Sequence, residues 1–283
     1  MKRFKTTYWH PQGASRRVMT LVAVIALFSM LAVETWKTSR QQVHFRDKIR
    51  AANIARQAYE AVKRERLSRH LDIDPDTDPM QSGLIGATMS RATTHQGYLN
   101  AKITSVNPNF ASLVVHWLVK AKVNAGDTIA VGFSGSFPAL NIAVLAAAKA
   151  LRLRPLIISS AGASQYGANM PKFMWPDIEQ SLNKHGIFSY KSLAVSPGGP
   201  DDRALGLSKK GKSYIEDAVR RSGRFYLMPE NYDDSLAKRM ALFNKHALGS
   251  KIKAYINVGG GTISVGTRFG KQKFKSGLNL RPP

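Results

Sequence analysis

The sequence predicts an α/β domain with a mainly parallel, Rossmann-like sheet flanked by helices, preceded by an N-terminal transmembrane helix and a helical stalk. Two observations support this fold class. Apolar strand-like segments alternate with helical segments along most of the chain, which is the pattern of parallel strand–helix–strand units. A long apolar segment also lies near the N-terminus. Strands as apolar as these are usually covered by helices on both faces.

The composition indicates an anionic partner. The chain has 283 residues and 42 Lys and Arg against 18 Asp and Glu, which gives a formal net charge of +24. Such an excess suits nucleic acid, membrane headgroups or an acidic polymer. No nucleic-acid recognition motif or zinc-ligand spacing accompanies the charge, so we expect no nucleic acid, metal or cofactor. The absence of cysteine excludes disulfides and a cysteine nucleophile.

The apolar N-terminal segment has the length of a membrane span. Residues 18–33 contain only Thr20 and Ser29 as polar side chains, and extension to Trp36 approaches the ~20 residues needed to cross the bilayer core. A cleaved signal peptide is the alternative. Cleavage after Ala32 would place a methionine two residues before that site, where a small residue belongs, so we favour an uncleaved signal anchor.

Four parts follow from this anchor. We expect a basic tail at 1–17, a transmembrane signal anchor at 18–36, a juxtamembrane helix at 37–71 and the α/β domain at 72–283. Cations lie on both sides of the span, which weakens the positive-inside contrast. The short basic tail is the easier part to retain in the cytoplasm, so we expect the large domain on the outer side.

The segment after the anchor has helical periodicity. Apolar or small side chains recur at steps of three and four residues at Ile49, Ala52, Ala55, Tyr59 and Val62. We interpret this helix as a solvated stalk, with a partner-binding helix as the alternative. The acidic stretch DIDPDTDP that follows lacks the glycine and distal glutamate of an EF-hand, so we interpret it as a boundary loop and not a calcium site.

The remaining elements are read from periodicity and from turn residues. Helices are expected at 109–123, 137–151, 175–185, 209–222 and 235–247, and strands at 127–133, 155–159 and 253–258, with 262–265 continuing or pairing beside the last strand. In such sheets, ligands bind at the carboxyl ends of the strands. The loops after the three strands are therefore the candidate sites.

The first loop, GFSGSFP, has three interpretations. Ser134 could be a nucleophile, but Ser136 replaces the last glycine of the G-x-S-x-G elbow, and no spacing singles out a histidine partner. A helix start with hydroxyls and backbone donors also suits an anion. The third interpretation is a helix cap in a tight turn. The further candidates for binding a ligand or anion in the three loops are Gly135, Ser136, Asn141, Ser159, Ser160, Gln165, Asn257, Gly259, Gly260, Gly261 and Thr262.

The glycine-rich loop NVGGGT, residues 257–262, is similar over a short stretch to the phosphate loop of the actin and Hsp70 ATPases. That superfamily has an aspartate where this chain has Asn257, and no matching first phosphate loop is found. Three successive glycines also allow close backbone approach without any nucleotide.

Longer blocks resemble the poly-gamma-glutamate system protein family. These blocks are TSVNPNFASLVV at 104–115, GFSGSFPALNIAVLAAAKAL at 132–151, IISSAGASQYGAN at 157–169 and KHGIFSYKS at 184–192, with the acidic loop and GLIG at 72–86 and the N-terminal anchor. The resemblance implies a single-pass protein of the bacterial inner membrane that serves the synthase or exporter of the capsule polymer. It brings no catalytic residue with it.

Charge and resemblance agree on the partner. Poly-gamma-glutamate carries one carboxylate per residue, so a cationic chain would attract it through many weak, salt-sensitive contacts. The candidate contact residues in the basic C-terminal stretch are Arg268, Lys271, Lys273, Lys275 and Arg281. A solvated tail is the alternative. We expect a non-catalytic accessory of polymer synthesis, export or retention; a serine hydrolase or transferase using Ser134 is the second hypothesis, and a nucleotide-binding protein the third.

Overall fold

The computed structural model describes residues 13, 15–37, 40–259, 261–266 and 268–281. It divides into two compact units, Met1–Val43 and His44–Pro283. The first unit contains α1 (Arg16–Thr35), a 20-residue helix with a hydropathy of 2.2. The Ser15 hydroxyl caps this helix by accepting from Val18 N at 3.4 Å. The expected anchor is therefore a helix long and apolar enough to span a membrane.

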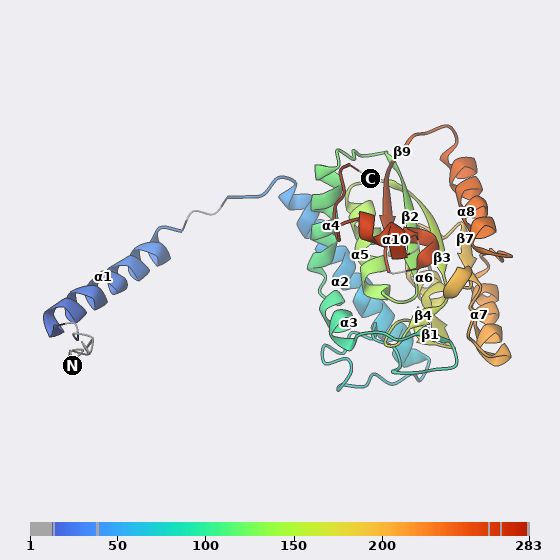
Figure 1. The fold of residues 1–283 in the computed structure, drawn as a ribbon, viewed down its shortest axis with the longest axis horizontal. Coiled ribbons are helices and arrows are strands. Elements are labelled where there is room, and N and C mark those ends of the chain that lie inside the picture. Colours follow the sequence, from blue (N-terminus) through green and yellow to red (C-terminus); the bar gives the residue numbers. More distant parts are fainter. Residues whose placement is uncertain (1–12, 14, 38–39, 260, 267, 282–283) are drawn as a thin grey trace, which may run out of the picture. The chain divides into compact units, whose positions relative to one another are not determined.

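The second unit is built on a five-stranded sheet. Its strand order is β8 (Phe225–Tyr226), β7 (Ala194–Ser196), β3 (Arg154–Ser160), β2 (Thr128–Ser134) and β9 (Ile252–Asn257), and all four neighbouring pairs are parallel. The chain leaves β2 for β3, β7 and β8 in turn, and then returns to place β9 on the other side of β2 (Figure 1). The direction of winding thus reverses at β2, where a parallel sheet offers a crevice at its carboxyl edge.

Helices cover both faces of this sheet, which alternates its apolar side chains between them. On one face, Ile129, Val131 and Ile157 pack into the main core with α4 (Asn109–Lys120) and α5 (Pro138–Ala150). On the other face, Ala130, Leu156 and Ile158 pack under α8 (Tyr232–Ala247). Figure 1 shows α4 and α5 on one side of the strands and α8 on the other. The α/β class and the mainly parallel sheet flanked by helices are confirmed.

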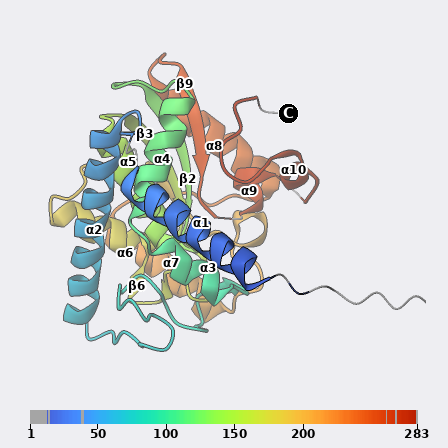
Figure 2. The same cartoon turned by 90° about the vertical axis from the view of Figure 1, so that its left-hand side faces the viewer.

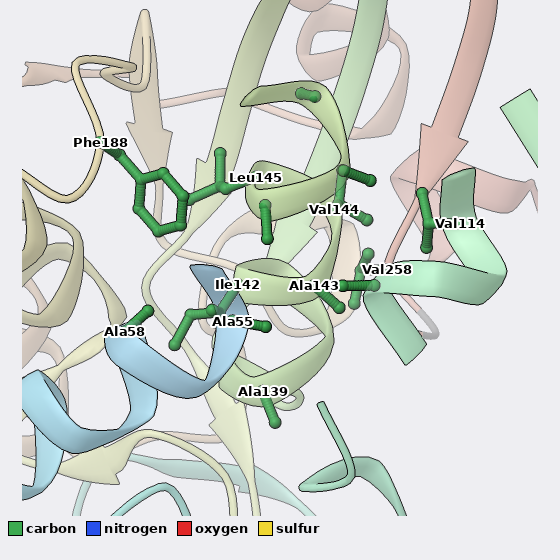
Figure 3. Packing of buried hydrophobic residues seen from close by; sticks show 14 of the residues in the cluster. Ala55, Ala58, Val114, Ala139, Ile142, Ala143, Val144, Leu145, Phe188 and Val258 are labelled. Carbon is green, nitrogen blue, oxygen red and sulfur yellow. The ribbon is translucent and has the colours of Figure 1, made fainter. Parts of the chain in front are cut away.

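The predicted solvated stalk is wrong. Residues 45–68 form α2 (Phe45–Ser68), and this helix is part of the main core. Figure 3 shows Ala55 and Ala58 of α2 beside Ile142 of α5. In the view of Figure 2, the layer formed by α2 and α4 is turned toward the reader. The Tyr59 hydroxyl also donates to Ala139 O of α5 at 3.2 Å. The periodicity of this segment was correctly identified as helical. Its apolar face packs against another helix of the same unit.

The boundary expected at residue 72 is corrected for the same reason. The compact unit begins at His44, and the end of α2 is tied to the loop that follows it. The buried Arg66 guanidinium donates to the carbonyls of Asp72, Gly83 and Ile85. Asp78 accepts from Ser82 N and Gly83 N within that loop. The acidic stretch is therefore a structured turn in the body, and among the described residues no group of three metal-ligating side chains occurs.

The remaining elements are shorter or complete the covering layers. They are α3 (Leu99–Ser105), α6 (Trp175–Lys184), the 3₁₀ helix η1 (Pro200–Asp202), α7 (Lys209–Ser222), α9 (Thr262–Val265) and α10 (Arg268–Lys273), with the small strands β1 (Thr93–His95), β4 (Ala163–Ser164), β5 (Asn169–Met170) and β6 (Phe173–Met174). β1 pairs with β4 in parallel, and β5 pairs with β6 in an antiparallel hairpin. Thr262–Val265 is thus helical, and the expectation of a strand there is wrong.

The place of α2 in the core predicts a different response on its two faces. Ala58→Leu adds volume to a fully buried contact and should lower the free energy of unfolding by about 1–3 kcal/mol, because the close-packed neighbours cannot yield. Gln57→Leu is the matched control, since Gln57 is exposed on the same helix, and it should change that free energy by less than about 0.5 kcal/mol. Denaturant titration of the full chain in detergent measures both. A solvated stalk would make the two variants alike.

Candidate functional site

The loops at the carboxyl edge of the sheet form one hydrogen-bonded cluster. Gly135 N, after β2, donates to Ser160 O at the end of β3 at 3.1 Å, and Ala168 N donates back to Gly135 O at 2.7 Å. Val258 N, after β9, donates to Gly132 O at 2.9 Å. The sequence-based candidates around Ser134, Ser160 and Asn257 are therefore brought together at the reversal point, as the expected topology requires.

Ser134 and Ser136 make a tight turn between β2 and α5. Ser134 Oγ donates to Ser136 Oγ at 3.1 Å and accepts from Ser136 N at 3.2 Å. Ser136 Oγ also accepts from Ser164 N at 3.0 Å, and Ser136 is buried. These bonds fix the turn before α5, whose first turn starts at Pro138. The turn interpretation of GFSGSFP accounts for these hydrogen bonds of the two hydroxyls.

A buried lysine stabilises this turn from behind. Lys102 on α3 is 3 % exposed, and its ammonium donates to Ser136 O and, at 2.9 Å, to Ser164 Oγ. Lys102 Nζ also lies 3.6 Å from the centroid of the Phe137 ring. Burial lowers the pKa of Lys102 to about 8. No sequence motif marks this lysine, which lies far along the chain from both serines. The one available signal in the sequence was the presence of a lysine in a helix that is half apolar.

The other candidates of the first two loops are held by the protein itself. Asn141 is fully buried on α5; its Nδ2 donates to Ser134 O at 3.0 Å, and its Oδ1 is the one buried side-chain atom without a partner in the described part of the chain. Ser160 Oγ donates to Phe133 O at 3.3 Å. Gln165 Oε1 accepts from Gly97 N at 3.2 Å. Each side chain therefore contributes to closing a loop against a neighbouring segment.

The Ser159 side chain is buried in the core, one residue before the carboxyl end of β3. It is fully buried, its hydroxyl lies 2.6 Å from Ser192 Oγ, and Trp175 Nε1 donates to it at 3.1 Å. Ser192 N donates in turn to Glu179 Oε1 at 2.9 Å, and Arg224 Nε lies 3.2 Å from the same oxygen. The structure therefore places Ser159 in a buried network with α6, where no ligand at the edge would reach it.

The third loop lies against the first. Asn257 Nδ2 donates to Gly259 O at 2.8 Å. Gly259 has a φ of +101°, and a Cβ on it would come within 2.8 Å of Ser134 Cβ. This position therefore requires glycine for both conformation and space. Gly261 precedes and Thr262 begins the four-residue helix α9, while Gly260 lies outside the described residues.

His95 lies near this edge, because Gln165 N donates to its carbonyl at 3.1 Å. It lies on β1, which pairs with β4, and its Nδ1 is 2.8 Å from Thr94 Oγ1. Desolvation, with the positive charges of Lys102 and Lys271, lowers the pKa of His95. Within the described residues, neither a histidine nor a carboxylate is hydrogen-bonded to Ser134, whose partner is Ser136. The geometry thus lacks the base that would activate a serine nucleophile.

A fourth loop at this edge was missed by the sequence analysis. Residues 196–204, SPGGPDDRA, follow β7 and include positive φ angles at Asp201 and Asp202. The Asp202 carboxylate, 1 % exposed, accepts from Ser196 Oγ at 2.6 Å and from Ser235 Oγ at 2.7 Å. Arg239 on α8 pairs with it at 2.8 Å. The run of proline, glycine and aspartate after a short apolar segment was the available signal.

The expected polyanion contacts lie on the C-terminal segment. Lys271 and Lys273 belong to α10, and Lys275 and Arg281 follow it; all four side chains are exposed. Arg268 begins α10, and its side chain is outside the described part. These cations therefore lie where a polymer in solution can reach them.

The charge of Lys102 predicts a pH-dependent contribution to stability. Below about pH 8 this lysine is protonated in both the folded and unfolded chain, and its burial costs free energy; between about 8 and 10.5 the folded state loses the proton first, so the cost falls. The free energy of unfolding should therefore rise over that window relative to Lys102→Met, by up to about 3 kcal/mol. Denaturant midpoints at several pH values measure the difference. Lys120→Met, an exposed change on α4, serves as the control, and a pH-independent difference would contradict the buried charge.

The Asp202–Arg239 pair predicts a large response to loss of one charge. Asp202→Asn leaves Arg239 buried without a counter-charge and should lower the free energy of unfolding by about 3–5 kcal/mol. Asp233→Asn, exposed at the start of α8, is the control and should cost less than about 1 kcal/mol. Adding Arg239→Met to the Asp202 variant should recover part of the loss. Equal losses for the two aspartates would disprove the role of the pair.

Comparison with known protein families, with curated proteins and with solved structures finds no match to this chain.

Proposed function

We propose that this chain is a membrane-anchored accessory protein of poly-gamma-glutamate synthesis, export or retention, acting as a non-catalytic scaffold or polyanion-binding component. The observation that carries the proposal is the net charge of +24 on a chain whose N-terminal helix is long and apolar enough to span a membrane. A polymer with one carboxylate per residue gains affinity from many weak contacts and from counterion release, as nucleic acids do with basic proteins. The choice of poly-gamma-glutamate as the polymer rests on the resemblance of several sequence blocks to the poly-gamma-glutamate system protein family.

The proposed location follows from α1. We place this single span in the bacterial inner membrane and the larger unit on its outer side, where the polymer would emerge. The synthase or export subunits of the same system are the proposed protein partners. The reversal of winding at β2 supports the Rossmann-like interpretation of the sheet, with the cluster of loops as a ligand-facing edge.

A hydrolase or transferase that uses Ser134 is the second candidate function. It is favoured by the position of Ser134 at the end of a central strand, and opposed by the hydrogen bonding of its hydroxyl to Ser136 alone within the described residues. Nucleotide binding at 257–262 is weaker still as a proposal, because the helix that follows has only four residues and offers little dipole to a phosphate.

Polymer production in cells tests the proposal. Deletion of the gene should reduce the poly-gamma-glutamate made, exported or retained, and the Ser134→Ala chain should restore both yield and chain length, because a scaffold does not need that hydroxyl. Size-exclusion profiles of the capsule polymer measure both. A deletion strain that makes, exports and retains the polymer normally would contradict the proposal. A clear shift in polymer chain length with Ser134→Ala would favour the enzyme instead.

Binding of the purified chain tests the polyanion contacts. Neutralising Lys271, Lys273, Lys275 and Arg281 to Gln should weaken polymer binding by at least roughly tenfold at low salt, because four surface contacts of about 0.3–1 kcal/mol each are lost. The control neutralises four exposed lysines elsewhere, at Lys209, Lys210, Lys245 and Lys251. An equal loss in both variants would show that charge alone acts and that the C-terminal segment has no special part.

A further inference from the structure

A basic depression lies at the end of the body opposite the candidate site. It encloses about 620 Å³ and is lined by the start of α2 and by the turns that follow α4 and α5. The chain passes from the end of α4 into the start of β2 and from the end of α5 into the start of β3, so the ends of both helices place this depression at the amino edge of the sheet. It shares no residue with the loops around Ser134.

The charge of the depression is mostly positive. Arg50, Lys122 and Arg152 line it with exposed side chains, against the carboxylate of Asp47, which bonds His44 at 2.9 Å and lies 3.4 Å from Arg50. Within the described residues, Lys122 and Arg152 form no ion pair. Part of this charge complements the negative ends of α4 and α5, each of which is equivalent to about half an elementary charge. The two full positive charges of Lys122 and Arg152 are larger than that sum.

Apolar side chains are exposed in the same first turns of α2. Phe45 is 44 % exposed and Ile49 is 47 % exposed, and their spacing of four residues places them on one side of the helix. Arg46 is exposed beside them. A helix start that exposes aromatic and aliphatic groups next to arginine has the composition of a membrane interface. In water alone, exposure of these two apolar side chains contributes no favourable free energy, whereas burial in a membrane interface would.

The connection to α1 limits where this end can go. Residues 36–43 link the end of α1 to the first residue of the body, and a fully extended chain of that length reaches at most about 28 Å. If α1 spans the bilayer, the start of α2 therefore stays near the headgroups at all times. The attraction of basic residues to an anionic leaflet falls off within a Debye length of about 8–10 Å. A linker of at most about 28 Å allows the start of α2 to come within that distance of the headgroups.

We propose that this end of the body, which carries the exposed side chains of Phe45, Ile49, Arg50, Lys122 and Arg152, docks on the anionic lipid headgroups of the membrane that holds α1. The inference rests on the proposed membrane anchoring and goes beyond it. Docking at this end holds the body upright on the bilayer. Because α2 has 24 residues and is about 36 Å long, the loops at its far end are then held well above the headgroups, free to meet a polymer.

The absence of cysteine makes a direct test simple. The full chain carrying Asn124→Cys is labelled with a fluorophore and reconstituted in vesicles of phosphatidylcholine with about one third phosphatidylglycerol, together with a lipid that bears a quencher in its headgroup. Asp76→Cys, an exposed position in the loop beyond the far end of α2, is the matched control. Quenching at position 124 should exceed that at position 76 by at least roughly threefold in these vesicles, and should fall in pure phosphatidylcholine and at high salt.

Charge reversal separates docking from mere proximity. Lys122→Glu with Arg152→Glu should lower the quenching at position 124 to the level of position 76, whereas Lys209→Glu with Lys210→Glu, an equal change of charge at the start of α7, should leave it unchanged. Circular dichroism of all variants checks that they fold. Quenching at position 124 no greater than at position 76, or unaffected by the first reversal, would overturn the inference.

Two further outcomes keep the inference distinct from the proposed function. Flotation with vesicles under alkaline carbonate reports on α1 alone: a chain that fails to float has no anchor, and both proposals fall. A chain that floats but shows no extra quenching at position 124 overturns only the docking. If poly-gamma-glutamate added in detergent changes the fluorescence at position 124 while anionic vesicles do not, the surface binds the polymer and the inference is wrong.

Discussion

The burial of α5 on nearly all sides is the constraint on which the rest of this structure depends. Eleven of its 13 residues are buried, so the sheet alone cannot cover it. Another helix must pack on its outer side, and α2 and α4 do so through small side chains such as Ala55 and Ala58 (Figure 3). Alanine on both helices permits close approach of the backbones, and any larger residue there would force them apart.

This constraint ties the anchor to the fold. One of the helices that cover α5 is the helix that follows the N-terminal apolar segment, so the residues directly after that segment are part of the core of the second unit. A solvated stalk would have let the body move freely at the end of a long tether. Only residues 36–43 lie between the end of α1 and the first residue of the second unit.

Much of the fold could be predicted because its central elements carry strong local patterns. The strand before Ser134, the alanine-rich helix and the next strand have the expected period and turn residues, and α7 begins and ends where the periodicity does. β7 and β8 are three and two residues long, too short for any alternation to show. The role of α2 was misjudged because a helical period reveals an apolar face but not what covers it. The observed phase also exposes Ile49 and buries Lys48 instead, while Arg66, a candidate last member of the predicted apolar face, is buried.

The candidate site shows a sharper division between what sequence can and cannot indicate. Glycine and serine at strand ends predicted where the loops would converge, because sheet topology decides that. The partners that hold them could not be predicted, since Lys102 and Arg239 act across many residues of chain and no motif marks them. These partners also bear on chemistry. The Ser134 hydroxyl already donates to Ser136, and Lys102 already contacts a carbonyl and an aromatic ring. These contacts hold the loops in place. An edge made rigid in this way can present a surface to an extended polymer, whereas bond-making would require freeing one of these groups first.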